Sequence, residues 1–283
     1  MPHEAPTHRH EWSLLRAGAF RLDGGGMFGL VPKVLWSRLV EPDGLNRIPL
    51  QTNCLLLRGE GRTVLVETGF GDKWSDRDRE IFALERRTVV DAMREVGAAP
   101  DDVTHVIVTH LHFDHAAALT RVGASGGPEP TFPRAEIIVQ RAEWNDALAN
   151  KSTMTRTYLR SHLDPIRDRV RLVDGAVEVL PGIEVDPIPG HTWGQQSVRF
   201  RDAHGVVCFP ADVMPTAHHV GLAFSMGYDM LPYQNMLSKR ALLERAAREG
   251  WRLVLDHEPG HPIVRVEADP RERDRWRLAA ADA

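Results

Sequence analysis

The chain of 283 residues has few cysteines and no long apolar run. Its two cysteines, Cys54 and Cys208, are too few for a disulfide framework, and both lie in apolar, strand-like segments. We therefore expect buried, reduced thiols. No apolar run approaches the roughly 18–20 residues that a membrane-spanning helix needs. The N-terminal segment MPHEAPTHRHEW also lacks the basic flank and apolar stretch of a secretory signal, so we expect a soluble, cytoplasmic protein.

An excess of positive charge is missing as well. The chain has 35 Lys and Arg against 39 Asp and Glu, with a formal net charge of −4. This balance argues against a general electrostatic attraction to nucleic acid or to an anionic membrane, and we expect neither as a partner. Hydrophobic residues make up 42% of the chain and charged residues 26%, which is typical of a globular protein with a substantial core.

Short apolar runs bounded by glycine and proline predict a chain rich in strands. We expect strands within residues 14–22, 52–59, 63–69, 103–110, 135–140, 177–212 and 251–258. We expect helices at residues 75–97, 142–150 and 234–250. This order favours two sheets with helices outside them over a strict βαβ alternation. The Gly- and Pro-rich segment 24–49 predicts a loop, although it carries several large apolar side chains.

The segment THLHFDHAAAL (109–119) directly follows a predicted strand and contains three histidines and an aspartate. If the chain stays extended, His110 and His112 lie on the same side, whereas Asp114 and His115 come where the chain must turn. Imidazole nitrogens and carboxylate oxygens are the ligands that zinc and similar cations prefer. A polar turn with chance histidines is the alternative, and recurrence of the same residue types at other strand ends argues against it.

Three further candidate ligands end apolar strands elsewhere in the chain. His191 lies in PGHTWGQQS, Asp212 ends GVVCFPAD, and His257 lies in LVLDHEP. Sites on sheet scaffolds usually lie in the loops that follow strands. Each residue alone would be interpreted as a turn or capping residue, but together with the first cluster they predict a site for two metal ions. We prefer His257 to His261 because His257 directly follows the apolar strand.

Three other histidines are assigned no ligand role. His105 lies within a predicted strand and is expected in the core or beside the ligands. His218 and His219 lie in the loop after the last aspartate of the set. They are candidates for substrate contact, but a pair of histidines in a loop is more typical of the protein surface.

The ordered pattern H-x-H-x-D-H, a later His after a Pro-Gly turn, then Asp and His resembles the metallo-β-lactamase superfamily over nearly the whole chain. TVLVETG (63–69) is similar to the first motif of that superfamily, with Glu67 where Asp is usual. The resemblance implies a single domain over residues 1–283, of the α+β class. Its architecture would be an αββα four-layer sandwich with a dinuclear site at one edge of the sheets.

The resemblance also implies the ligands and their roles. It assigns His110, His112 and His191 to one divalent cation, Asp114, His115 and His257 to the other, and Asp212 to both. The expected ions are Zn²⁺, although the same ligands accept Fe, Mn or Co. Two cations roughly 3.5–4 Å apart lower the pKa of a bridging water and provide a hydroxide nucleophile at neutral pH. Asp114 and Asp212 are the expected catalytic residues, and Asp114 would also carry a proton to the leaving group.

Within the superfamily, HLHFDHAAAL, PGHTWGQQS and the histidine after the last strand most resemble the quorum-quenching N-acyl-homoserine lactonases and the methyl-parathion-hydrolase-like enzymes. The resemblance implies a hydrolase that opens a lactone or cleaves a carboxylic ester, and that forms a homodimer. Segments 27–49 and 213–233 are the expected pocket or interface loops. The residues expected to contact the substrate are Met27, Phe28, Trp36, Phe224 and Tyr228.

Two other functions stay open at this stage. Lactonases of this group commonly carry a tyrosine three positions after the bridging aspartate, where this chain has Pro215. Either Tyr228 or Tyr233 is a candidate to supply the missing hydroxyl, and a phosphotriesterase or aryl esterase is the alternative activity. A non-catalytic, metal-bearing ligand-binding protein is the alternative from another class. The complete set of ligands for two metals argues against it.

Overall fold

The computed structural model describes residues 8–272 and 274–282. The strands of the first half are β1 (Glu11–Asp23), β2 (Arg47–Gly59), β3 (Arg62–Val66), β4 (His105–Ile107), β5 (Thr120–Val122), β6 (Pro128–Pro130) and β7 (Glu136–Gln140). Those of the second half are β8 (Val170–Val173), β9 (Val177–Leu180), β10 (Ile183–Pro187), β11 (Gln196–Asp202), β12 (Gly205–Phe209), β13 (Arg252–Val254), β14 (Ile263–Ala268) and β15 (Trp276–Ala280).

The helices are short, apart from the last one. The α-helices are α1 (Gly24–Phe28), α2 (Lys33–Trp36), α3 (Asp76–Phe82), α4 (Val89–Glu95), α5 (Phe113–Ala116), α6 (Arg141–Leu148), α7 (Arg160–Leu163) and α8 (Pro232–Glu249). The 3₁₀ turns are η1 (Pro100–Asp102), η2 (Ala117–Leu119), η3 (Asp164–Arg169), η4 (Ala211–Val213) and η5 (Ala217–Val220). Within the described residues, no helix has the length and apolar character required to cross a membrane.

The strands form two mixed sheets and one small hairpin. The first sheet has the order β1-β2-β3-β4-β7-β8, and the second has the order β15-β14-β13-β12-β11-β10-β9. β3, β4, β7 and β8 run parallel to one another. In the second sheet β12 and β13 are parallel, and β10 and β12 are both antiparallel to β11, so these three strands point the same way. Their carboxyl ends therefore reach the same edge of the sheet.

Alternating side chains of the central strands supply two separate cores of the sandwich. In β3, Val64 and Val66 point between the two sheets, where they join Phe209 of the second sheet. Leu65 points to the opposite face and packs in the cluster that contains Met93 of α4. This pattern explains why the buried strands appear as nearly continuous apolar runs in the sequence.

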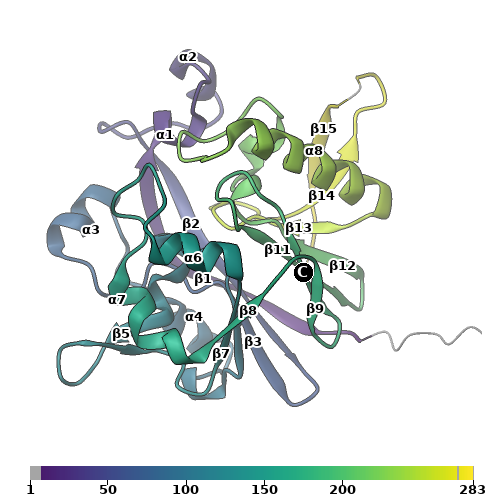
Figure 1. The fold of residues 1–283 in the computed structure, drawn as a ribbon. Helices are drawn as coiled ribbons and strands as arrows, with labels where there is room; N and C mark the ends of the chain where they lie inside the picture. The colour runs from purple at the N-terminus through teal and green to yellow at the C-terminus, as the bar shows by residue number, and fades with distance from the viewer. Residues whose placement is uncertain (1–7, 273, 283) are drawn as a thin grey trace, which may run out of the picture.

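The outer face of the second sheet is covered by α8. Leu242 and Leu243 of this helix lie in one cluster with Leu253 of β13 and Val264 of β14. In Figure 1, α8 runs along the side of the second sheet, and α4, α6 and α7 gather on the side of the first sheet. The layers are helix, sheet, sheet and helix, so the predicted αββα sandwich is confirmed.

The predicted helix over residues 75–97 is wrong in extent, because the structure contains two helices there. Ala83 adopts a left-handed conformation with φ 47° and ends α3. Thr88 then begins α4, where its backbone N–H donates to Asp91 Oδ2 at 2.9 Å. The side chains of Thr88 and Asp91 form a capping box, a start signal that the sequence already carried.

The segment 24–49 is not simply a loop, because it contains α1, α2 and the first residues of β2. The side chain of Asp23 accepts a hydrogen bond from Gly26 N at 2.9 Å and caps α1. Met27, Phe28 and Trp36 are buried in a cluster at the end of the sandwich. The large apolar side chains of this segment thus build a core of their own.

The two cysteines are buried thiols, as predicted, because Cys54 and Cys208 are both free and buried.

Candidate metal centre

The predicted ligands are delivered by loops that follow four strands. His110 and His112 follow β4, and the carbonyl of His112 accepts from Ala116 N at 2.9 Å in the first turn of α5. His191 lies between β10 and β11, Asp212 lies in η4 after β12, and His257 follows β13. These strand ends meet at one edge of the sandwich, so residues far apart in the sequence form one buried cluster.

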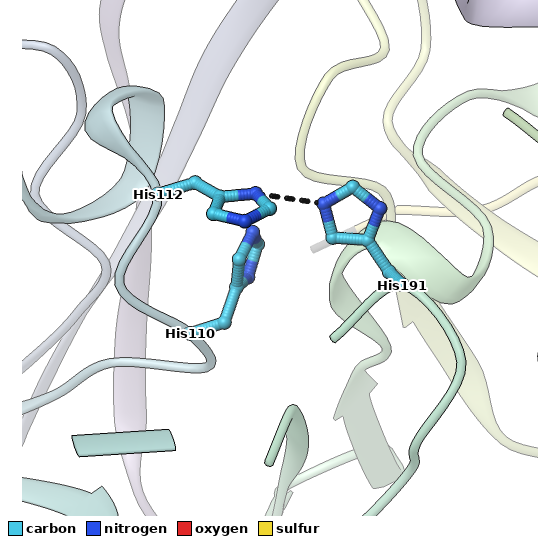
Figure 2. A group of neighbouring side chains, drawn as sticks. All are labelled: His110, His112 and His191. Carbon is cyan, nitrogen blue, oxygen red and sulfur yellow. Dashed lines mark hydrogen bonds between the residues drawn. The ribbon is translucent and has the colours of Figure 1, made fainter. Parts of the chain in front are cut away.

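His110, His112 and His191 form a first group, shown in Figure 2. One nitrogen from each ring lies within 4.8 Å of the others, and all three side chains are buried. His112 Nδ1 and His191 Nε2 face each other at 2.9 Å. Figure 2 shows the three rings converging from two separate loops on one point, which is the arrangement of a set of ligands.

A second group contains His115, Asp212, Asp256 and His257, again with one potential ligand atom of each within 4.8 Å of the others. His115 Nε2 and His257 Nε2 face each other at 3.1 Å. Asp256 was not selected from the sequence, although its position beside His257 at a strand end was an available signal. Asp114 borders this group, since its Oδ2 lies 3.5 Å from His257 Nε2 and its Oδ1 lies 3.8 Å from His115 Nε2.

Asp212 lies between the two groups. Its Oδ2 is 3.1 Å from His191 Nε2 in the first group. Its Oδ1 is 3.3 Å from His257 Nε2 and 3.7 Å from His115 Nε2 in the second group. A single carboxylate therefore presents one oxygen to each group.

The donor atoms of the two groups fit divalent cations. Within residues 8–272 and 274–282, nothing hydrogen-bonds to His110 Nε2, His112 Nε2 or Asp212 Oδ1, although these atoms are buried. A buried polar atom without a partner costs about 1–3 kcal/mol, so three of them in one cluster require an explanation. Imidazole and carboxylate donors that converge on shared points are the ligand set of zinc and related metals.

The pKa is lowered for two of the five candidate histidines and raised for the other three, which lie beside carboxylates. Burial and the neighbouring imidazoles lower the pKa of His110 and His112 well below the ordinary value, so both rings are neutral and able to act as ligands. Burial also lowers the pKa of His115, but Asp114, Glu67 and Asp212 outweigh it and hold that pKa well above its ordinary value. A cation would satisfy the same carboxylates in place of the proton.

The second nitrogen of several rings is held by the protein. His191 Nδ1 lies 3.0 Å from Asp229 Oδ1, and His257 Nδ1 lies 3.0 Å from the carbonyl oxygen of Gln51. His115 Nδ1 lies 3.2 Å from Glu67 Oε2, and the same carboxylate accepts from the backbone at Thr109. Such contacts fix the ring orientation and the tautomer of a metal-binding histidine. Glu67 is placed to orient the ring of His115 in this way.

A cavity of about 310 Å³ opens above the cluster. Its floor contains His112, Asp114, His191, Asp212 and His257. Its walls are mostly apolar and include Leu22, Met27, Phe82, Phe113, Met226 and Tyr228. The ring of Phe113 packs 5.1 Å from Trp74 and 5.3 Å from Phe82 within this wall.

The residues expected to contact substrate fall into two sets. Met27 and Tyr228 line the cavity. Phe28, Trp36 and Phe224 lie behind its lining, with Phe28 stacked on Trp36 at 5.3 Å and packed edge-on against Phe224 at 6.1 Å. These three residues support the wall, and their contact with a substrate stays a prediction.

Other histidines are placed differently from their expected positions. His219 was expected at the surface, but it is fully buried, and its Nε2 lies 2.8 Å from the carbonyl oxygen of Met27. Its ring also stacks on Phe28 at 5.1 Å, so it supports the cavity wall. His261 is exposed, whereas His257 lies in the cluster. His105 is only partly buried, and its Nδ1 lies 2.9 Å from Thr104 Oγ1.

Fold and site together define a metallohydrolase-type αββα sandwich with a buried histidine and carboxylate centre. Residues 47–257 match the family model of the metallo-beta-lactamase superfamily, and the chain belongs to this superfamily. Among solved structures, a probable metal-dependent hydrolase from Staphylococcus aureus has a TM-score of 0.86 and 25% sequence identity, covering 99% of this chain and all of the other. AidC, a dizinc quorum-quenching lactonase, has a TM-score of 0.78 at 15% identity, covering 99% and 97%. At that identity the likeness concerns the fold alone.

Curated relatives carry a more specific name. An N-acyl homoserine lactonase from Bacillus thuringiensis is 32% identical over 171 residues, which are 56% of this chain and 61% of that protein. An N-acyl homoserine lactonase from Azorhizobium caulinodans is 28% identical over 177 residues, or 60% and 64% of the two chains. The matched region therefore spans less than two thirds of either relative.

Proposed function

We propose that the protein is a single-domain, dinuclear metal-dependent hydrolase that opens lactones or cleaves carboxylic esters. N-acyl-homoserine lactones are the first candidate substrates. The observation that carries the proposal is the position of Asp212, which lies 3.1 Å from His191 and 3.3 Å from His257 through its two different oxygens. This is the arrangement expected of a ligand shared by two cations. The names of the curated relatives support the choice of substrate class.

In this proposal each cation has its own histidines. The ligands are His110, His112 and His191 for one cation, His115, His257 and Asp114 for the other, and Asp212 for both. Cations held by these residues, with Zn²⁺ as first choice, would supply Lewis acidity for the scissile carbonyl oxygen and for a water molecule. The carboxylate of Asp114 lies in the cavity floor, where it is able to hold a proton and pass it to the leaving oxygen.

Tyr228 is the proposed donor to the substrate, in place of the tyrosine that is absent at position 215. It lines the cavity, whereas Tyr233 is 70% exposed. Burial raises the pKa of Tyr228 to about 12, and Asp23 and Asp114 add to this effect. The hydroxyl is therefore protonated at neutral pH and able to donate a hydrogen bond to the substrate carbonyl. The apolar walls exclude water and accept an acyl chain.

A second candidate activity is hydrolysis of aryl esters or phosphotriesters. The observation that favours it is the aromatic part of the wall, where Phe82, Phe113 and Tyr228 border the cavity. Aromatic side chains pack well against an aryl leaving group.

Metal analysis and a substrate panel test the proposal. We expect about two equivalents of metal per chain. The panel compares acyl-homoserine lactones, δ-lactones, aryl esters and paraoxon-type phosphotriesters by kcat/KM, and the first group should rank highest. A preference for phosphotriesters over every lactone would favour the second candidate. Binding of two metals without turnover of any compound would favour a non-catalytic protein. Clearly less than two equivalents, with no activity restored by Zn²⁺, Mn²⁺ or Co²⁺, would refute the dinuclear centre.

A further inference from the structure

Glu143 is a fully buried carboxylate in α6, outside the two candidate metal groups. Burying a carboxylate is costly unless hydrogen-bond donors compensate for the lost water. Three donors do so here. Oε1 accepts from Leu111 N at 2.9 Å and from Tyr158 Oη at 3.0 Å, and Oε2 accepts from Thr192 Oγ1 at 2.6 Å.

The first and third of these donors belong to the loops that carry the first histidine group. Leu111 lies between His110 and His112, and Thr192 directly follows His191. One oxygen of Glu143 therefore holds one loop, and the other oxygen holds the second loop. In the direction of the chain these loops are far apart, and Figure 2 shows their histidines meeting at one point.

The backbone also brings the second loop close to Glu143. A Cβ atom added at Gly194 would overlap the backbone nitrogen of Glu143, so only glycine allows this approach. Tyr158 extends the same network toward the cavity floor, because its ring lies 5.0 Å from the ring of His112. Its neighbour Thr157 lines the cavity.

We infer that Glu143 is a positioning residue for the first metal group. It holds the loops that carry these histidines in place relative to the cavity wall. The inference rests on the metal centre of the proposed function. Residues that orient metal ligands from outside typically contribute 10–100-fold to metal affinity. Removing the carboxylate would also leave Leu111 N–H and the Tyr158 hydroxyl buried without partners, and the loops would shift to find new ones. Glu67 has the corresponding position for the second group, since it contacts His115.

The test measures Zn²⁺ affinity by competition with a chelator, in the absence of substrate. Glu143→Ala and Glu143→Gln are each made in three backgrounds of the full chain. These are the wild type, H191A, which disables the first group, and H257A, which weakens the second group. We expect E143A to weaken Zn²⁺ binding about 10-fold or more in the H257A background and to have little effect in the H191A background. E143Q should recover much of the affinity, because its amide oxygen still accepts from Leu111 N while Thr192 is able to accept from its amide nitrogen.

Matched variants complete the design. Glu67→Ala should show the reverse selectivity between the two backgrounds, and the exposed Glu244→Gln should change neither affinity. If E143A does not fold, as judged by circular dichroism, Thr192→Val decides the question, because it removes one donor and keeps the shape of the side chain.

Wild-type Zn²⁺ affinity in folded E143A, or in T192V where E143A is unfolded, would overturn the inference. Equal losses in the two backgrounds would do so as well. A protein that binds two Zn²⁺ ions but turns over no compound of the substrate panel would refute the proposed function and leave this inference standing.

Discussion

Asp212 is the residue on which both proposed cations depend, because its oxygens face different histidine groups. Asp212→Ala should lower kcat/KM by more than about 100-fold and should reduce bound metal at both groups, since a ligand matters at least as much as the residues that orient it. Metal analysis and turnover of the best panel substrate measure the two effects. Asp174→Asn, at an exposed ion pair with Arg141, is the control. Retention of activity in D212A would remove Asp212 from the proposed centre.

Tyr228 permits a sharper test of how substrate is held. A hydrogen bond contributes about 0.5–1.5 kcal/mol, so Tyr228→Phe should lower kcat/KM by up to about 10-fold without loss of metal. Tyr233→Phe is the matched control, because Tyr233 is exposed and away from the cavity. Equal effects of the two substitutions in steady-state kinetics would argue against a role of the Tyr228 hydroxyl.

At the scale of single residues, the sequence predicted which histidines and aspartates gather in one cluster better than it predicted which residues line the cavity. His191, Asp212 and His257 each end an apolar strand, and spacing along the chain made them visible. Asp256 and Glu143 were missed, because each is one of many acidic residues until the fold buries it beside the cluster. Pocket residues depend on how loops pack, and local sequence carries little information about that packing.

At the scale of the elements, the contact between His219 of η5 and Met27 of α1 should make the stability of the protein depend on pH. Burial lowers the pKa of His219 to about 3, and Lys239 adds to the effect. Its ordinary value is 6.5, so between pH 6.5 and 3 the unfolded state binds the proton and the folded state does not. The free energy of unfolding therefore falls as the pH falls through this range. The variant His219→Gln should lack most of this decrease in the free energy of unfolding.

Urea unfolding of the metal-free proteins checks this expectation. From pH 7 to pH 5, the free energy of unfolding of the wild type should fall by about 2 kcal/mol more than that of H219Q. His261→Gln, at an exposed position, should show no such change. A difference between wild type and H219Q that is constant with pH would contradict a neutral buried His219.

Element boundaries were predicted where apolar periodicity is strong and missed where local chemistry decides. Residues 75–97 are helical in large part, with Val89 and Met93 buried, yet the left-handed Ala83 breaks this region into two helices. β14 and β15 were not predicted, because charged residues interrupt the short apolar stretches of both strands. Pairing with neighbouring strands forms β14 and the edge strand β15, and pairing is not a local property.

At the scale of the whole molecule, two sheets with helices outside could be predicted from the order of strands and helices, and the four-layer sandwich from the resemblance to the superfamily. The homodimer stays a prediction. Segment 27–49 exposes large apolar side chains, namely Leu30, Val34, Leu35, Leu39 and Leu45. In Figure 1, α2 within this segment projects from the body of the molecule. Exposed apolar side chains gathered in this way are typical of an interface.

Sedimentation velocity tests the dimer. The wild type should sediment as a dimer, and the double variant Leu30→Asp and Leu35→Asp should be a monomer, because two buried charges would oppose association. Ile81→Asp is the control, at another exposed apolar residue. A wild type that is monomeric at micromolar concentration, or a double variant that is still a dimer, would contradict the prediction that segment 27–49 forms a dimer interface.

The candidate ligands come from both sheets, between His110 after β4 and His257 after β13. The complete cluster therefore exists only when the two halves of the chain are folded against each other, and a cation bound there is a ligand of the native state. By thermodynamic linkage, a site with free metal at 100 times its dissociation constant would add about 2.7 kcal/mol to stability. Excess chelator should accordingly lower the melting temperature of the wild type, but much less that of D212A. The supply of metal in the cell would then set the abundance of the folded protein as well as its activity.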